Sequence, residues 1–182
     1  MNRTIVPIDH PALRAHAKEI AVDEINTPYV QDLIADMKAL LAKERLGVAI
    51  AAPQVGEAVR LFIVSGKVFL PAVEDDADPQ PGTLIPPDQV FINPTILKLS
   101  QKKEDMHEGC LSLPGIWGEV PRSIRARISA YDEHGTPITR GASGLLAHVF
   151  QHEIDHLEGI IYIDKAHDMY EDSTETETEE TL

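Results

Sequence analysis

The chain has 182 residues, with 16 lysine and arginine residues against 30 aspartate and glutamate residues and a formal net charge of −14. This length predicts one domain that can bury an apolar core without disulfides or structural metals. The acidic balance argues against direct nucleic-acid binding, because neutralising phosphates requires clustered lysine and arginine. One cysteine allows no intramolecular disulfide and favours a reducing compartment, the cytoplasm. We expect no secretory signal and no membrane span.

The first part of the chain predicts helices followed by strands. Residues 11–22 are weakly amphipathic and predict a short helix. Thr27 followed by Pro28 is typical of a helix start, and apolar residues at helical spacing continue the helix to about residue 45. Residues 47–56 form a small-residue run that predicts a buried strand and a turn, where another backbone or a ligand could approach closely. Residues 59–65 predict the next strand.

The second part predicts mainly strands before a second helix. Residues 71–89 are rich in proline and acid and predict a surface loop, and residues 90–99 predict a strand. Residues 125–131 and 136–139 predict a hairpin that leads into a helix starting at Ser143, and residues 160–163 predict a short strand. We therefore expect one domain over residues 1–166. Residues 167–182 predict a disordered acidic tail, because they contain few apolar residues to offset the entropy of ordering.

A metal-binding pattern lies within the second helix, which Gly159 is expected to end. The pattern is His-Glu-x-x-His, and positions four apart share one helix face, so His152 and His156 can bind the same divalent cation. Glu153 can then reach a water bound to that cation. A single buried or solvated histidine would need no such explanation, but the pair with its glutamate favours metal-assisted hydrolysis.

The third protein ligand distinguishes several kinds of site. The extended metzincin pattern fits at Gly159 but has Tyr162 where its third histidine should stand. A gluzincin would need a downstream glutamate, and Glu171 and Glu175 lie in the predicted tail. Cys110 is the remaining candidate. A lone cysteine is usually a small buried hydrophobe, but its thiolate also binds zinc and ferrous iron strongly.

Three segments, at residues 47–54, 108–112 and 151–156, resemble the three motifs of peptide deformylases in order and rough spacing. The resemblance covers about residues 5–164. It implies an α+β fold in which a central motif-bearing helix packs against antiparallel β-sheets. It also implies one divalent metal ion held by Cys110, His152 and His156. That ion would be iron (Fe2+) in the cell, with Zn2+, Ni2+ or Co2+ as alternatives.

The resemblance implies hydrolysis of the formyl group from the N-terminal formylmethionine of new polypeptides, with release of formate. Glu153 would transfer protons, while the side-chain amide of Gln54 and the backbone N–H of Leu111 would stabilise the oxyanion. The residues implied in substrate binding are Val48, Ala49, Ile50, Met106, Gly109, Leu145, His148 and Val149. Among them we expect His148 to turn its polar edge toward solvent.

Three features depart from the family pattern. Ala49 stands where the first motif has a second glycine, so its methyl group could restrict the backbone or crowd a ligand. Trp117 stands where many relatives carry a charged residue. The acidic C-terminus replaces the basic helix with which some relatives dock on the ribosome, so we expect weak ribosome association or another contact surface. We expect a monomer. The alternatives are a zincin-type metallopeptidase and a catalytically impaired relative that binds peptides.

Overall fold

The computed structural model describes residues 3–70 and 83–172. Its two α-helices are α1 (Pro28–Leu41) and α2 (Leu145–Leu157). The strands are β1 (Ala49–Ala51), β2 (Leu61–Val64), β3 (Gln89–Leu99), β4 (Lys103–Cys110), β5 (Leu113–Ser123), β6 (Arg125–Tyr131), β7 (Pro137–Ser143) and β8 (His167–Glu171). Short 3-10 helices lie at Pro11–Arg14, Val22–Glu24, Ala52–Val55, Gly66–Phe69 and Tyr162–Asp164.

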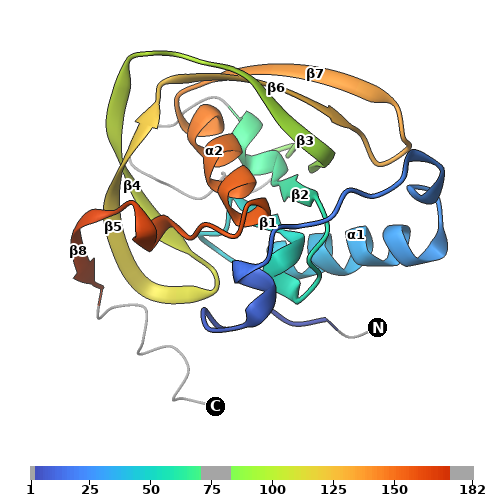
Figure 1. Cartoon of the computed structure of the whole chain (residues 1–182), viewed down its shortest axis with the longest axis horizontal. Helices are drawn as coiled ribbons and strands as arrows, with labels where there is room; N and C mark the ends of the chain where they lie inside the picture. Colours follow the sequence, from blue (N-terminus) through green and yellow to red (C-terminus); the bar gives the residue numbers. More distant parts are fainter. Residues whose placement is uncertain (1–2, 71–82, 173–182) are drawn as a thin grey trace.

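Two antiparallel sheets surround α2 (Figure 1). The larger sheet has the order β1-β2-β3-β6-β7, and the smaller has the order β4-β5-β8. This arrangement confirms the predicted α+β architecture, with the motif-bearing helix at the centre. None of the helices within residues 3–70 and 83–172 is both long and apolar enough to cross a membrane.

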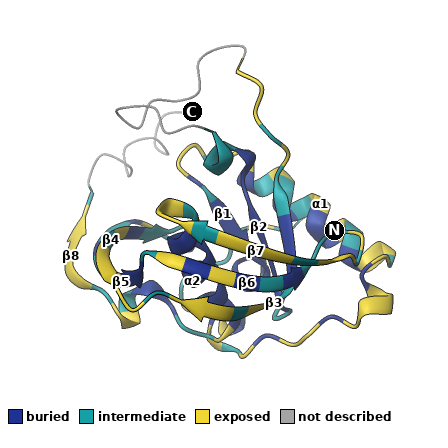
Figure 2. Cartoon of the chain, turned by 90° about the horizontal axis from the view of Figure 1, so that it is seen from above, coloured by how far each residue is buried: buried dark blue, intermediate teal, exposed yellow. Residues whose placement is uncertain are grey.

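The larger sheet separates two apolar clusters, because successive side chains of a strand point to opposite faces. Phe62, Val64 and Phe91 face α2, where the ring of Phe91 meets that of Phe150 edge-on at a centroid distance of 5.2 Å. Ile63 and Ile92 face α1. Burial on both faces explains why β1 and β2 read as continuous apolar runs rather than alternating ones (Figure 2).

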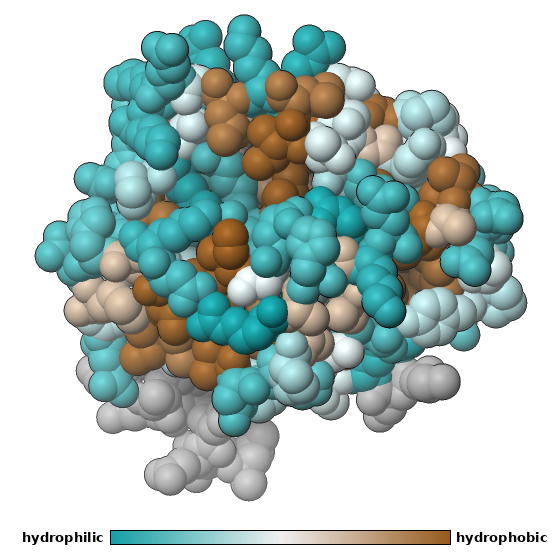
Figure 3. Space-filling model, in the orientation of Figure 1, coloured by the Kyte–Doolittle hydropathy of each residue, from teal (hydrophilic) through white to brown (hydrophobic). Residues whose placement is uncertain are grey.

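The exterior carries no continuous apolar face in the view of Figure 3. Hydrophobic residues lie there in separate patches divided by hydrophilic ones, and one patch covers the tip of the β4–β5 hairpin at the lower left. Strands β7 and β8 are largely exposed (Figure 2).

Several predicted elements are confirmed with small changes at their ends. Helix α1 begins at Pro28 after Thr27, as predicted, but ends at Leu41 rather than near residue 45. The strands predicted at residues 59–65 and 90–99 correspond to β2 and β3. Part of the predicted loop, residues 71–82, lies outside the described residues. The other part, residues 83–88, contains no helix or strand.

Other predictions of local structure were wrong. Ser143 does not begin the helix but ends β7, and Gly144, with φ of 57°, makes the turn into α2. No strand forms at residues 160–163; the 3-10 helix Tyr162–Asp164 begins there instead, and the Asp164 carboxylate accepts a hydrogen bond from the N–H of Ile161, which precedes this helix. Within residues 11–22 only short 3-10 turns form, because the backbone of Lys18 instead pairs with Ala58 and Arg60.

The predicted boundary of the tail at residue 166 was also wrong. Residues His167–Glu171 form β8, whose backbone pairs with β5. Hydrogen bonds of a sheet edge can order a polar segment that would not order by itself. Residues 173–182 lie outside the described residues.

Candidate metal centre

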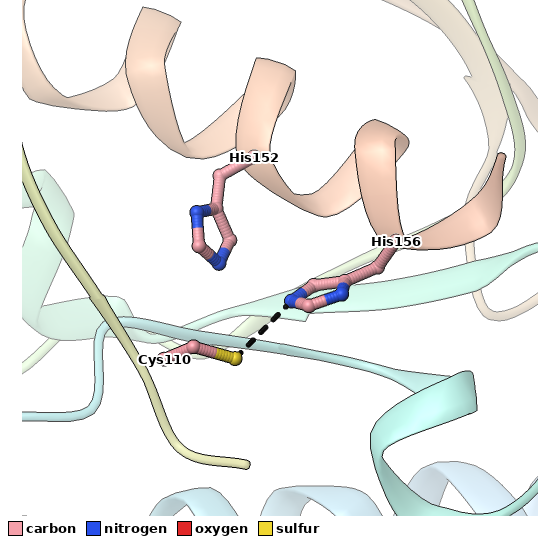
Figure 4. Close-up of side chains that lie close together, drawn as sticks. All are labelled: Cys110, His152 and His156. Carbon is pink, nitrogen blue, oxygen red and sulfur yellow. Dashed lines mark hydrogen bonds between the residues drawn. The ribbon is translucent and has the colours of Figure 1, made fainter. Parts of the chain in front are cut away.

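His152 and His156 project from α2 toward Cys110, which ends β4 (Figure 4). The candidate ligand atoms of these three residues all lie within 4.8 Å of one another. The Cys110 Sγ and His156 Nε2 atoms are 3.4 Å apart. A tetrahedral ion with usual metal–sulfur and metal–nitrogen bond lengths would place such a pair about 3.6 Å apart. The donor set therefore fits one divalent cation.

The local backbone explains how Cys110 reaches this position. Pairing of β4 with β5 shifts register between Glu108 and Cys110, so that Cys110 lies opposite Leu113. Such irregularities bend a strand and redirect its side chains. Glu108 also points inward and is buried, whereas His107, which directly precedes it, is exposed.

A buried charge network orients His152. Its Nδ1 atom lies 2.8 Å from a carboxylate oxygen of Glu108, which leaves Nε2 available for a metal. Arg122 donates two hydrogen bonds to the same carboxylate, at 2.7 and 3.0 Å, and also donates to Asp155. Burial opposes ionisation of Glu108, but the hydrogen bonds from Arg122 and His152 outweigh it and lower the pKa of Glu108 to about 2.

No role for Glu108, Arg122 or Asp155 was predicted from the sequence. Glu108 and Asp155 do lie inside the second and third motif segments, beside the metal ligands, and this proximity was the one available signal. Arg122 follows only from the pairing of β4 with β5.

The two histidines differ in their tendency to hold a proton. Burial opposes the charged form of His152, yet its hydrogen bonds with Cys110 and Glu108 raise its pKa well above the usual value. Burial and the nearby charge of His152 lower the pKa of His156 well below the usual value. Since only a deprotonated nitrogen can bind a metal, loading of the site should release a proton from His152.

Gln54 is fixed beside the same three residues. Its Oε1 atom accepts a hydrogen bond of 2.8 Å from the Ala51 N–H, which directs the amide nitrogen Nε2 toward Cys110 Sγ at 3.3 Å. Gln54 is buried within the 3-10 helix Ala52–Val55. Leu111 follows Cys110 directly, and its side chain packs against the apolar cluster of α1.

Glu153 is a buried carboxyl group without a structural partner for one of its oxygens. Its Oε2 atom is buried and forms no hydrogen bond within the described part of the chain. Burial raises the pKa of Glu153 to about 7, although the charge of His152 acts in the opposite direction. A carboxyl group that titrates near neutral pH can both accept and return a proton.

This burial predicts that Glu153→Gln stabilises the metal-free protein at pH 8 but not at pH 4. The folded state binds the Glu153 proton more tightly than the unfolded state, whose pKa is near 4.5. The resulting stability is complete below pH 4.5 and is lost as the pH rises through 7. The full effect is about 3 kcal/mol. Urea unfolding of both proteins at the two pH values measures it, and an equal difference at both would contradict the burial argument.

The residues implied in substrate binding fall on three elements. Strand β1, with Ala49 and Ile50, is an edge strand that pairs only with β2 within the described residues, and Val48 precedes it. Leu145 and Val149 belong to α2, where Leu145 is 52% exposed. Met106 and Gly109 lie on β4.

The expectation for His148 was wrong. His148 is 5% exposed, and neither ring nitrogen has a hydrogen-bond partner within the described residues. Burial lowers its pKa, so the imidazole is neutral. The nearby carboxylates of Glu108 and Glu104 on β4 favour the charged form, but burial outweighs them. The helix turns this side chain inward together with its neighbour Val149.

The methyl group of Ala49 is accommodated without strain. Ala49 is buried in the cluster that contains Phe62 and Phe150, so its side chain points into the core. Its backbone does not adopt a positive φ, so no glycine is needed there. Both observations argue against crowding of a ligand at β1.

Comparisons with known proteins show the family to which the chain belongs. The family model for polypeptide deformylase matches residues 2–172. Peptide deformylase 2 of Ralstonia nicotianae is 43% identical over 141 residues, covering 78% of this chain and 75% of the relative. Peptide deformylase of Leptospira biflexa is 37% identical over 163 residues, covering 90% of this chain and 87% of the relative.

Solved structures show the same fold. A peptide deformylase from Synechococcus elongatus in complex with actinonin has a TM-score of 0.74 at 30% identity, covering 91% of this chain and 79% of that one. A class I type b peptide deformylase from Acinetobacter baumannii with bound Met-Ala-Ser has a TM-score of 0.76 at 29% identity, covering 91% of this chain and 98% of that one. This chain belongs to the peptide deformylase family and is a metal-dependent hydrolase that removes the formyl group from newly made polypeptides.

Proposed function

We propose that Cys110, His152 and His156 bind ferrous iron and that Glu153, Gln54 and the backbone of Leu111 act on the formyl group. The convergence of the three donor atoms within 4.8 Å is the observation that carries this proposal. One thiolate and two imidazoles also suit zinc, nickel and cobalt, so the choice of iron rests on the family resemblance. When bound, the ion lowers the pKa of a coordinated water and so supplies hydroxide near neutral pH.

Glu153 is the proposed proton carrier. Its carboxylate takes the proton of the attacking water and then delivers it to the leaving amine of the peptide. The pKa of about 7 suits both steps, because the group gains and loses its proton at similar cost near pH 7. The unpartnered Oε2 atom leaves one oxygen available for this transfer.

Gln54 and Leu111 are proposed to stabilise the oxyanion that forms when the formyl carbon is attacked. The Ala51 N–H holds the Gln54 side chain, so its Nε2 donor is oriented before the substrate binds. The N–H of Leu111 lies at the tip of the β4–β5 hairpin, next to Cys110. Preorganised donors act strongly because they need no reorientation during the reaction.

Gln54→Ala is expected to lower kcat for formate release by about 100- to 1,000-fold, the usual cost of losing one oxyanion donor. KM should change little, because the donor acts mainly on the transition state. The measurement is steady-state formate release from formyl-Met-Ala-Ser by metal-loaded protein. Equal metal content in variant and wild type is the required control, since Gln54 also contacts Cys110. An unchanged kcat would remove Gln54 from the mechanism.

We propose that the substrate binds as an extended strand along β1. An edge strand offers unpaired backbone groups, and the small side chains of Ala49 and Ala51 lie in the core, away from this edge. The methionine side chain of the substrate would contact Val48, Met106, Leu145, His148 and Val149, while Gly109 would approach the peptide backbone. The exposed Leu145 marks the outer end of this contact region.

The identity of the metal is tested by removing bound metal from the protein and reloading it anaerobically with Fe2+, Zn2+, Ni2+ or Co2+. We expect formate release with iron to survive anaerobic handling and to decay in air, because both ferrous iron and the Cys110 thiolate are oxidised. A protein that is active with zinc alone would overturn the choice of iron.

The cellular setting is also a proposal. We propose a cytoplasmic monomer that acts on formylated nascent peptides without binding RNA through its acidic C-terminus. Residues 173–182 include four glutamates and no basic residue, so ribosomal RNA should repel them. Removing these residues should leave co-sedimentation with ribosomes in moderate salt unchanged. Binding that depends on them would contradict this argument.

A further inference from the structure

Strand β8 completes the sheet that carries Cys110. It pairs with β5 through Ile116 with Glu171, Trp117 with Tyr170, and Glu119 with His167. The Asp172 N–H also donates a 2.7 Å hydrogen bond to the Gly115 carbonyl. A two-stranded hairpin is only marginally stable by itself, whereas a third strand makes it substantially more stable. The C-terminal strand, red in Figure 1, therefore supports the hairpin that bears a metal ligand.

An aromatic stack, made of His107, Trp117 and Tyr170, joins β8 to β4. The His107 ring lies parallel to Trp117, with centroids 5.0 Å apart and planes 2° apart. It also lies near-parallel to Tyr170, at 5.4 Å and 20°. The Tyr170 hydroxyl is 2.6 Å from His107 Nε2, and His107 Nδ1 is 3.2 Å from Glu119. These contacts suit an imidazole that accepts from the tyrosine and donates to the glutamate.

The aromatic stack packs against Gly109, the residue before Cys110. A Cβ atom added to Gly109 would lie 3.0 to 3.2 Å from three carbons of the Trp117 indole. The indole therefore covers the Gly109 backbone directly, and Gly109 is bonded to Cys110. A continuous chain of contacts runs from Tyr170 through His107 and Trp117 to the backbone that directs the Cys110 sulfur.

We propose that β8, acting through the aromatic stack, positions Cys110 for metal binding, so that Tyr170 and Trp117 are positioning residues of the metal centre. The inference rests on the proposed ligand set. Two of its donors stand on α2, which is largely buried, whereas the third stands at the tip of a hairpin. Metal affinity requires all three within a few tenths of an ångström, so the hairpin is the part that needs support.

The test uses the full-length protein loaded with cobalt(II), whose visible and near-ultraviolet absorption reports thiolate coordination. Tyr170→Ala should release cobalt to a chelator about 10- to 100-fold faster than wild type and weaken the thiolate band, the usual cost of removing support behind a metal ligand. Tyr170→Phe keeps the ring, so its cobalt release rate should stay within about fivefold of the wild-type rate, which corresponds to the loss of one neutral hydrogen bond. Glu171→Ala, on the same strand but outside the aromatic stack, should match wild type.

Trp117→Leu provides an independent variant, because it removes the stacking without shortening β8. It should also accelerate cobalt release while leaving the unfolding temperature of the metal-free protein close to that of Glu171→Ala. Wild-type release rates and spectra in both Tyr170→Ala and Trp117→Leu would overturn the proposal. The proposal would also be overturned if Glu171→Ala released cobalt as fast as Tyr170→Ala, since that would assign the effect to the strand as a whole.

This readout is separate from the proposed activity. A wild-type protein that binds cobalt through Cys110 but releases no formate would contradict the proposed function and leave the positioning role intact. Full formate release by the wild type, combined with wild-type cobalt release rates in Tyr170→Ala and Trp117→Leu, would support the proposed function and contradict the positioning role.

Discussion

Glu153→Ala is expected to lower kcat for formate release by about 100- to 10,000-fold, the range typical for losing a general acid–base group. The effect should be large because no other group within residues 3–70 and 83–172 is placed to replace the Glu153 carboxylate. Glu108 has its pKa held at about 2 by Arg122 and His152, so it cannot carry a proton near pH 7. The remaining neighbours, His152 and His156, are the proposed metal ligands and would not be free to carry a proton.

The measurement is a comparison of Glu153→Ala with wild type at equal metal content. Metal binding should persist, because Glu153 does not belong to the group of three donors. Elemental analysis of both proteins is therefore the control. A Glu153→Ala variant that retains metal and has a kcat within tenfold of the wild-type value would contradict the assigned role.

Cys110→Ala is expected to weaken metal binding by more than about 100-fold, since even the loss of a partner behind a ligand costs 10- to 100-fold. Two imidazoles alone leave a divalent ion without the thiolate that completes the set of three protein ligands. Competition with a chelator measures the affinity. His134→Ala, which removes an exposed histidine in the turn between β6 and β7, is the matched control.

Undiminished metal affinity in Cys110→Ala would favour the zincin-type alternative, in which a downstream glutamate is the third ligand. The geometry of the described residues opposes that alternative. Glu171 lies exposed on β8 and is not among the residues that meet at His152 and His156. Glu175 lies outside the described residues.

The placement of His152, Glu153 and His156 on one helix could be predicted from the sequence because their relation is local. Helical geometry fixes which residues four positions apart share a face, whatever the rest of the chain does. Cys110 is different, since its distance from the helix depends on how β4 and β5 bend. Spacing alone left it as a candidate, and the family resemblance was needed to choose it.

The support behind the ligands could not be predicted, because it depends on pairing between distant segments. Strands β4 and β5 contain charged and polar residues at many positions, since one face of their sheet is exposed, so no apolar alternation marked them. Without that pairing, Arg122 could not be assigned to Glu108. Strand β8 was mistaken for tail because its order comes from β5 rather than from its own composition.

His148 shows the limit of residue statistics at a site. Histidines are usually partly exposed, and that tendency favoured a solvent-facing imidazole. Residue 148 lies one helical turn before His152 on the inward face of α2, and this position overrides the tendency and buries it.

The most direct test of deformylation is to incubate iron-loaded protein anaerobically with formyl-Met-Ala-Ser and to identify the products by mass spectrometry together with a formate assay. We expect one formate for each Met-Ala-Ser formed, no cleavage of the Met–Ala or Ala–Ser bond, and loss of both products when the metal is removed. Cleavage of a peptide bond, or no formate from folded and metal-loaded protein, would contradict deformylation as the activity of this chain.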